Sequence, residues 1–146
     1  MTLAEASPEW VVVDASFVLR YVLHTQAKRP HASGLKLLQH VELIVPALWN
    51  SEIANALVQA ERRGSAPPAK IGHALTLISA LNPAVDGNVV DVNRNLELAR
   101  AYGLSAYDAL YFELALRRKA ALATYDDAMI AAAPMAGIRL YPPPAP

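Results

Sequence analysis

The apolar positions of the chain gather in short runs that alternate with longer segments of helical spacing. Three runs rich in β-branched residues predict strands: Trp10 to Val13, Leu43 to Val45 and Val89 to Val92. Weaker runs at 121–124 and 138–141 predict two more. The first two runs do not alternate apolar with polar residues. Such continuous apolar strands are typical of a sheet that is covered on both faces.

Helix-like segments lie between these runs. They are predicted at about 15–25, 32–41, 47–63, 67–81, 94–102, 106–119 and 127–133. Because strands that alternate with helices form βαβ units, the sequence predicts an α/β sandwich with a mostly parallel central sheet. We expect a single domain with its core at about 10–141, followed by a proline-rich tail at 142–146.

Composition excludes several classes of protein. Of the 146 residues, 54% are hydrophobic and 18% are charged, which favours a globular domain over a disordered chain. The absence of cysteine excludes disulfides and thiolate metal sites and fits a cytoplasmic location. Neither a membrane helix nor a signal peptide is expected. The 13 basic and 13 acidic residues cancel, so nucleic-acid binding would have to rest on a local patch.

Acidic residues follow three of the predicted strands. Asp14 comes directly after the first strand, and Glu52 lies in the helix that follows the second. Asp126 and Asp127 come after the run at 121–124. Open α/β sheets bind ligands outside the carboxyl ends of their strands, so these acids are expected at the edge where such sheets position chemistry.

Asp14 and Glu52 also have purely structural interpretations. Asp14 suits a helix N-cap. However, Ser16 offers a second oxygen beside it, and the helix that follows is apolar on almost every side. These two features favour a functional role for Asp14. Glu52 borders the apolar stripe of its helix, with Asn55 one turn further on. Taken alone, Glu52 is equally consistent with a solvated side chain.

Asp108 and the doubled aspartate are similarly ambiguous. The segment from Ser105 to Asp108 fits a variant of the capping box. However, the helix that follows has almost no polar face. A carboxylate on such a helix is costly to bury without a compensating partner such as a cation. Either Asp126 or Asp127 could cap the next helix. Thr124 precedes Asp126 by two residues, which favours Asp126 as the site residue and Asp127 as its outer neighbour.

Other familiar chemistries lack their motifs. The chain has no GxxxxGK[ST] or GxGxxG phosphate loop, no HExxH metal motif and no G-x-S-x-G nucleophile elbow. A phosphoacceptor receiver domain would need an acidic pair after the first strand and a lysine after the last, and the sequence has neither.

Four motifs in order resemble those of PIN-domain ribonucleases, and among them the VapC-type toxins of bacterial type II toxin–antitoxin systems. They are VVVDASFVL, PALWNSEIANAL, LSAYDALYFELAL and LATYDDAM. The resemblance implies a three-layer α/β/α fold with a central parallel sheet. It also implies four catalytic acids, which are Asp14, Glu52, Asp108 and Asp126, with Asp14, Asp108 and Asp126 as metal ligands. Ser16, Asn55 and Thr124 are implied as polar supports, and the doubled aspartate leaves the choice between Asp126 and Asp127 open.

The resemblance further implies an endoribonuclease that depends on Mg²⁺ or Mn²⁺, is silenced by a cognate antitoxin and forms a homodimer. Clustered carboxylates raise one another's pKa values, and a hard divalent cation with oxygen ligands removes that penalty. Arg20, Arg62 and Arg117 are candidate RNA contacts, although each also suits the carboxyl end of a helix. The alternatives are a PIN nuclease outside toxin–antitoxin systems and a catalytically inactive PIN-like domain that binds a partner.

Overall fold

The protein, seen in a computed structural model that describes residues 9–23 and 33–144, is built around one parallel sheet. The strands lie in the order β3–β2–β1–β4. Their bounds are β1 (Trp10–Val13), β2 (Glu42–Pro46), β3 (Ala84–Asp86) and β4 (Ala121–Ala123). The predicted α/β class with a mostly parallel sheet is therefore confirmed.

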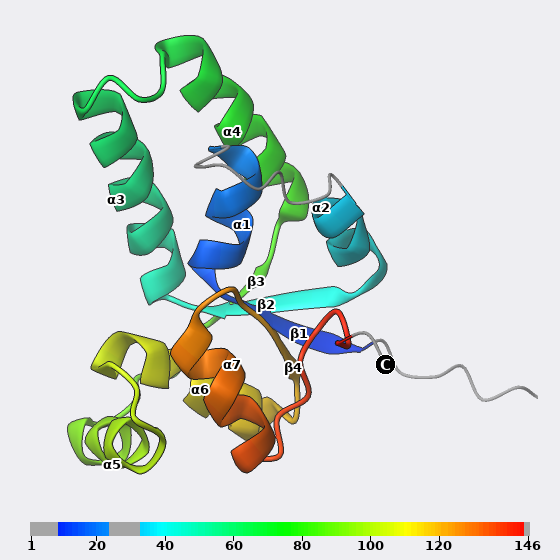
Figure 1. Cartoon of the computed structure of the whole chain (residues 1–146), viewed down its shortest axis with the longest axis vertical. Helices are drawn as coiled ribbons and strands as arrows, with labels where there is room; N and C mark the ends of the chain where they lie inside the picture. The colour runs from blue at the N-terminus through cyan, green and yellow to red at the C-terminus, as the bar shows by residue number, and fades with distance from the viewer. Residues whose placement is uncertain (1–8, 24–32, 145–146) are drawn as a thin grey trace, which may run out of the picture.

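Helices connect the strands and cover both faces of the sheet (Figure 1). They are α1 (Ala15–Val22), α2 (Ser33–Leu37), α3 (Leu48–Arg62), α4 (Pro68–Leu81), α5 (Val92–Tyr102), α6 (Ala106–Arg118) and α7 (Asp127–Met135), with a 3-10 turn η1 (Leu38–His40) before β2. Helices α1 to α4 lie on one face and α5 to α7 on the other, which gives the three expected layers (Figure 1). The last two positions of the helix predicted at 15–25 lie outside the described residues.

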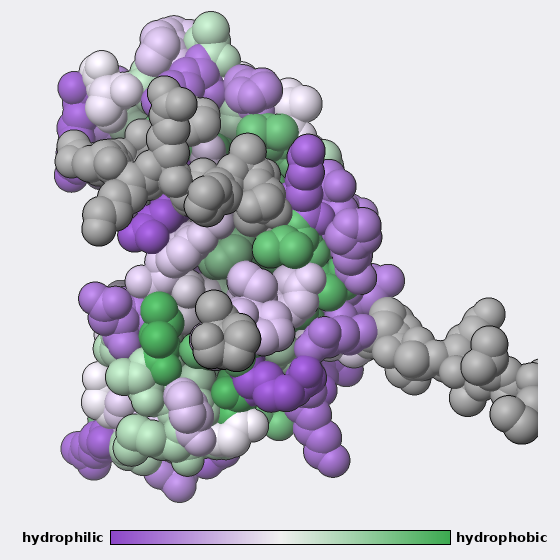
Figure 2. Space-filling view, turned by 45° about the vertical axis from the view of Figure 1, so that its right-hand side comes forward, coloured by the Kyte–Doolittle hydropathy of each residue, from purple (hydrophilic) through white to green (hydrophobic). Residues whose placement is uncertain are grey.

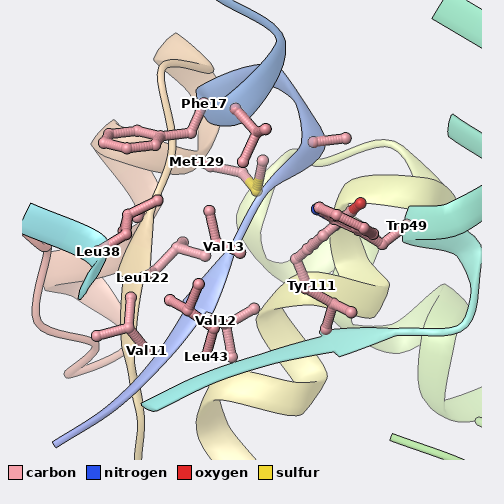
Figure 3. Close-up of a cluster of buried hydrophobic side chains, with 14 of the residues drawn as sticks. Val11, Val12, Val13, Phe17, Leu38, Leu43, Trp49, Tyr111, Leu122 and Met129 are labelled. Atoms are coloured by element: carbon pink, nitrogen blue, oxygen red, sulfur yellow. The ribbon is translucent and has the colours of Figure 1, made fainter. Parts of the chain in front are cut away.

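The centre of the sheet is buried from both sides, which explains its continuous apolar strands. Val11, Val12 and Val13 of β1 have no exposed surface, because β1 lies between two strands and between two layers of helices. Figure 3 shows side chains of both layers around this strand, including Phe17 of α1 and Tyr111 of α6. Burial of these side chains supplies the main driving force for folding.

The third strand lies earlier than the sequence predicts. The run from Val89 to Val92 is not a strand: Val89 is 95% exposed, and α5 begins at Val92. Asp91 caps this helix, because its carboxylate accepts a hydrogen bond from the backbone N–H of Arg94 at 3.1 Å. The prediction was wrong because the β-branched run was weighed without its aspartate cap, whereas the true strand at 84–86 is only three residues long.

The weak run predicted as a strand at 138–141 is reduced to a single parallel bridge between Leu122 and Leu140. The backbone N–H of Leu122 donates to the carbonyl of Arg139 at 2.8 Å, and the N–H of Tyr141 donates to the carbonyl of Leu122 at 2.9 Å. Pro142 follows at once, and proline has no N–H with which to continue the ladder.

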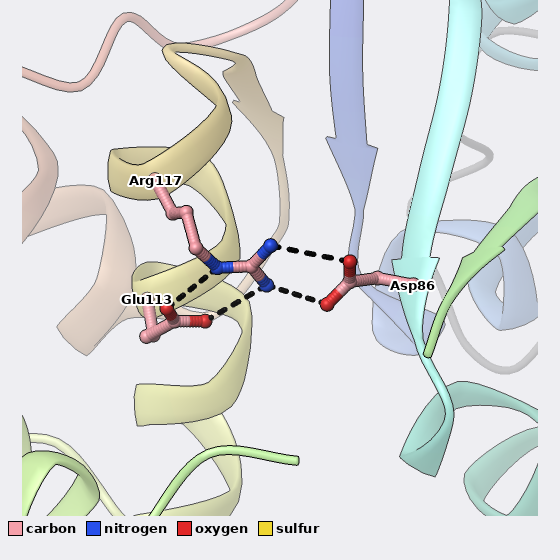
Figure 4. A network of polar contacts seen from close by, with 3 residues as sticks. All are labelled: Asp86, Glu113 and Arg117. Atoms are coloured by element: carbon pink, nitrogen blue, oxygen red, sulfur yellow. Dashed lines mark hydrogen bonds and ion pairs between the residues drawn. The ribbon is translucent and has the colours of Figure 1, made fainter. Parts of the chain in front are cut away.

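An ion-pair network fastens the edge strand β3 to α6 (Figure 4). The Arg117 guanidinium donates to both carboxylate oxygens of Asp86, at 3.2 and 2.5 Å, and to both of Glu113, at 2.8 and 3.2 Å. Hydrogen bonds from its guanidinium to the two acids raise the pKa of Arg117. Since Asp86 ends β3, the network fixes the position of α6 against the edge of the sheet.

The described surface is mixed in character. Figure 2 shows hydrophobic residues in small patches among hydrophilic ones. In the described part of the chain, no helix combines the length and the apolar character needed to cross a membrane.

Candidate active site

Four acidic side chains line one pocket of about 590 Å³ at the edge of the sheet where the strands end. They are Asp14, Glu52, Asp108 and Asp126. Asp14 follows β1, Glu52 lies on the helix after β2, and Asp126 follows β4. Helix α6 runs back toward the start of β4, so its N-terminal turn brings Asp108 to the same edge. The structure therefore brings together all four acids selected from the sequence.

Asp14 is held by two hydroxyl groups. Its Oδ2 accepts hydrogen bonds from the Ser16 hydroxyl at 2.5 Å and from the Thr124 hydroxyl at 2.8 Å, and only 4% of the residue is exposed. Asp14 occupies the N-cap position of α1, yet its side chain makes no capping hydrogen bond. A capping role therefore does not explain why a carboxylate is buried here.

Glu52 lies in the second turn of α3 and contacts the opposite helical layer. Its Oε1 accepts a hydrogen bond from the Tyr111 hydroxyl at 2.7 Å. Tyr111 belongs to α6 and is fully buried, so its hydroxyl needs a polar partner. Asn55, one turn beyond Glu52, also lines the pocket. These contacts place Glu52 in the pocket and exclude the alternative of a freely solvated side chain.

Asp108 and its capping residue have separate tasks. The backbone N–H of Asp108 donates to the Ser105 hydroxyl at 3.0 Å, so Ser105 provides the cap of α6. Burial and the neighbouring acids raise the pKa of the Asp108 carboxyl more than the Ser105 hydroxyl lowers it. The carboxylate is half-buried in the wall of the pocket, where it can accept a ligand.

The doubled aspartate divides into an inner and an outer residue. Asp126 lines the pocket and also caps α7, because its Oδ1 accepts a hydrogen bond from the Met129 N–H at 2.9 Å. Thr124 accepts a hydrogen bond from the Asp126 N–H at 3.0 Å while its own hydroxyl donates to Asp14. Asp127 begins α7, is exposed and does not line the pocket.

Burial and mutual repulsion shape the electrostatics of the pocket. Burial is the main cause that raises the pKa of Asp14, of Glu52 and of Asp108. The negative charge of neighbouring acids adds to each of these increases, whereas the hydroxyl groups that donate to the carboxylates oppose them. A bound cation would relieve both the repulsion and the cost of burial.

The donor set suits a hard divalent cation. All four acids offer carboxylate oxygens, which are the ligands that Mg²⁺ prefers. Across residues 9–23 and 33–144, no three His, Asp or Glu side chains are arranged to hold one ion between them. Mg²⁺ is usually bound through one or two carboxylates and keeps several water molecules, so a carboxylate of the pocket can also act on the ion through a bound water.

The three arginines considered as RNA contacts lie in different settings. Arg20 lines the pocket. Arg62 lies ten positions after Glu52 on α3, which is about 15 Å along a helix axis. Arg117 is engaged by Asp86 and Glu113 as described above.

Two tyrosines at the pocket were not selected as functional residues from the sequence. Tyr111 was assigned only to the apolar side of its helix, although it shares a face with Asp108 and a buried tyrosine usually has a hydrogen-bond partner. Tyr125 lines the pocket between Thr124 and Asp126. Its position inside the acidic motif is the signal that could have identified it.

The PIN domain family matches residues 11–134, which include every acid of the pocket. The chain belongs to the PIN domain family. PIN domains are in general nucleases that depend on divalent metal ions, so membership in the family indicates a hydrolase that acts on nucleic acid.

Among solved structures, this PIN domain resembles PAE2754 from Pyrobaculum aerophilum, with a TM-score of 0.64 and 24% sequence identity over 88% of this chain and 83% of that chain. At this level of identity, the likeness supports the fold alone. No curated protein matches the sequence.

Proposed function

We propose that this PIN domain is a Mg²⁺-dependent endoribonuclease and the toxin of a type II toxin–antitoxin system. The observation that carries the proposal is the convergence of Asp14, Glu52, Asp108 and Asp126 on one pocket. They come from four separate segments of the chain, and their own charges oppose this arrangement. Carboxylates gathered in a cleft against their own repulsion are typical of functional sites, and metal-assisted hydrolysis uses such a group of oxygen ligands.

Each side chain has a proposed role. Asp14, Asp108 and Asp126 are the metal ligands, and Ser16 and Thr124 keep the Asp14 carboxylate oriented. Asn55 supports the pocket wall beside Glu52. When bound, Mg²⁺ or Mn²⁺ would neutralise the carboxylates, orient a phosphate oxygen and lower the pKa of a water molecule.

Glu52 is the proposed general base. Burial raises its pKa, which makes its carboxylate a better proton acceptor than a solvated glutamate. In the proposed reaction, the oxygen of water forms a bond to the phosphorus atom of RNA while its proton moves to Glu52. The bond from phosphorus to the leaving ribose oxygen breaks, and that oxygen takes a proton from solvent.

The toxin role rests on the order of the four VapC-like motifs along the chain. In this proposal, the protein forms a homodimer in the cytoplasm, where its RNA substrate occurs, and a cognate antitoxin blocks the pocket until the toxin is released.

Expression in a bacterial host tests the toxin role. We expect the wild type and Asp127→Asn to arrest growth and Asp14→Asn to have no effect at equal protein levels. Co-expression of the small protein encoded beside the toxin gene should restore growth. Normal growth with the wild type, combined with RNA cleavage by the purified protein, would contradict the toxin role and leave the nuclease function standing.

A further inference from the structure

Of the residues that the structure describes, Arg20 is the single cation that lines the pocket, and it forms no ion pair with the acids around it. Its guanidinium lies over the ring of Tyr125, with Cζ 4.1 Å from the ring centroid. Among the described residues, no ion pair joins Arg20 to a carboxylate. An arginine beside several carboxylates would ordinarily form a charge-assisted pair with one of them. Its position over an aromatic ring therefore needs an explanation.

The Tyr125 ring is itself held by α1. It stacks on the ring of Phe17, with centroids 4.7 Å apart and an interplanar angle of 8°. Its hydroxyl forms a hydrogen bond with the hydroxyl of Tyr21. Phe17, Arg20 and Tyr21 are spaced i, i+3 and i+4, so they share one face of α1. Tyr125 is thus packed against that face and offers its ring to Arg20 at the rim of the pocket.

We propose that Arg20 binds a phosphate of the RNA strand and that Tyr125 is a positioning residue that keeps the guanidinium away from the carboxylates. This inference rests on the proposed ribonuclease function. A planar guanidinium donates two parallel hydrogen bonds to a phosphate and also stacks on aromatic rings, so one side chain satisfies both contacts. Without the ring of Tyr125, Arg20 would be free to fold onto the acids and neutralise the charge that holds the metal.

The charge distribution of the chain favours such a role for Arg20. The net charge is zero, and four acids at the pocket repel the RNA backbone. Arg117 cannot compensate, because Asp86 and Glu113 occupy its guanidinium. Arg20, unpaired at the rim of the pocket, is the described lining residue whose charge can attract a phosphate to the acids.

We would test the proposal by measuring the binding of a labelled single-stranded oligouridylate. The inactive Asp14→Asn protein, with Mg²⁺ present, serves as the background, so that the RNA is not cleaved. We expect Arg20→Gln to weaken binding about tenfold and to reduce the slope of log affinity against log salt by about 0.7. Arg100→Gln, on α5 and outside the pocket, removes the same charge and should leave both quantities close to those of the background. Arg20→Lys should retain the slope and lose part of the affinity.

Tyr125 is tested through its dependence on Arg20. Tyr125→Leu should weaken RNA binding when Arg20 is present and should have no further effect in the Arg20→Gln protein. Tyr125→Phe keeps the ring, so it should bind RNA almost as well as the background. Equal effects of Tyr125→Leu in both proteins would contradict the positioning role and indicate direct contact with the RNA.

The proposal is overturned if Arg20→Gln binds the oligouridylate as tightly as the background and with an unchanged salt slope. That outcome leaves the nuclease function intact, because RNA would still bind. If the wild type and the Asp14→Asn protein do not bind the oligouridylate at all, the proposed ribonuclease function and the Arg20 proposal are both contradicted.

Discussion

The hydroxyl of Tyr111 donates a hydrogen bond to Oε1 of Glu52 at 2.7 Å, and this contact joins helices that cover opposite faces of the sheet. Glu52 belongs to α3, and Tyr111 belongs to α6, the helix that also carries Asp108. The bond therefore fixes the relative position of two acids of the pocket, and it connects the fully buried core to the chemistry at its edge.

Tyr111→Phe should separate this positioning role from a role in folding. The ring is kept and the half-buried Glu52 can reach water, so the free energy of unfolding should change by no more than about 1 kcal/mol. We expect RNA cleavage to slow about tenfold, as is typical when the support of a metal or catalytic group is lost. The hydroxyl lowers the pKa of Glu52, so its removal should shift the acid limb of the pH–rate profile to higher pH. An unchanged profile and rate would contradict the role of Tyr111.

Asp126 has two roles that asparagine can separate. Asparagine caps helices about as well as aspartate, so Asp126→Asn should unfold at nearly the wild-type temperature but lose most of its cleavage activity. Asp126→Ala loses the cap as well, at a cost of about 1 kcal/mol in the free energy of unfolding. Asp127→Asn is the matched control and should keep its activity. A greater loss of activity from Asp127→Asn than from Asp126→Asn would reverse the assignment of the inner residue.

The burial of Asp14 predicts how the stability of the metal-free protein depends on pH. In the folded state the pKa of Asp14 lies above its ordinary value of 3.8. The contribution of Asp14 to the free energy of unfolding is therefore fully present below pH 3.8 and is lost as the pH rises through the raised pKa. Asparagine does not titrate, so above pH 3.8 metal-free Asp14→Asn should gain thermal stability relative to the wild type.

Mg²⁺ should reverse that difference at neutral pH. A cation bound by the carboxylates stabilises the folded state, so it should raise the unfolding temperature of the wild type more than that of Asp14→Asn. Parallel pH dependences for the two metal-free proteins, together with equal responses to Mg²⁺, would contradict the electrostatic description of the pocket.

The Arg117 network should contribute to stability. Arg117→Met leaves Asp86 and Glu113 without their shared partner, and we expect a loss of about 1 kcal/mol in the free energy of unfolding, smaller at high salt. Arg94 forms a single exposed pair with Glu97 at 3.6 Å, so Arg94→Met is the matched control, with an expected change within about 0.5 kcal/mol. Urea titration measures both, and equal losses would show that the network gives no advantage over one surface pair.

The fold class could be predicted because it depends on patterns that are local along the chain, whereas the four acids that line the pocket were selected from such patterns together with the family resemblance. A buried strand followed by an acid, as in Val13 and Asp14, places that acid at the end of the sheet whatever the rest of the molecule does. The order of the four motifs then supplied the family, which the match to residues 11–134 shows independently.

The remaining features depend on contacts between residues far apart in the sequence. The bond from Tyr111 to Glu52 spans 59 positions, and that from Thr124 to Asp14 spans 110, so no local pattern encodes either one. The third strand was misplaced for a local reason, because a helix cap was overlooked. Val89 belongs to a strand-like run, but the Asp91 cap beside it sets the start of α5.

Hydrolysis of a labelled single-stranded RNA by the purified protein is the most direct test of the nuclease assignment. With Mg²⁺ or Mn²⁺ present, the wild type should cleave the RNA internally, and a chelator should stop the reaction. Asp14→Asn, with an unfolding transition as cooperative as that of the wild type, should leave the RNA intact. Cleavage by Asp14→Asn at the wild-type rate, or by the wild type in the presence of the chelator, would contradict a metal-dependent reaction at this pocket.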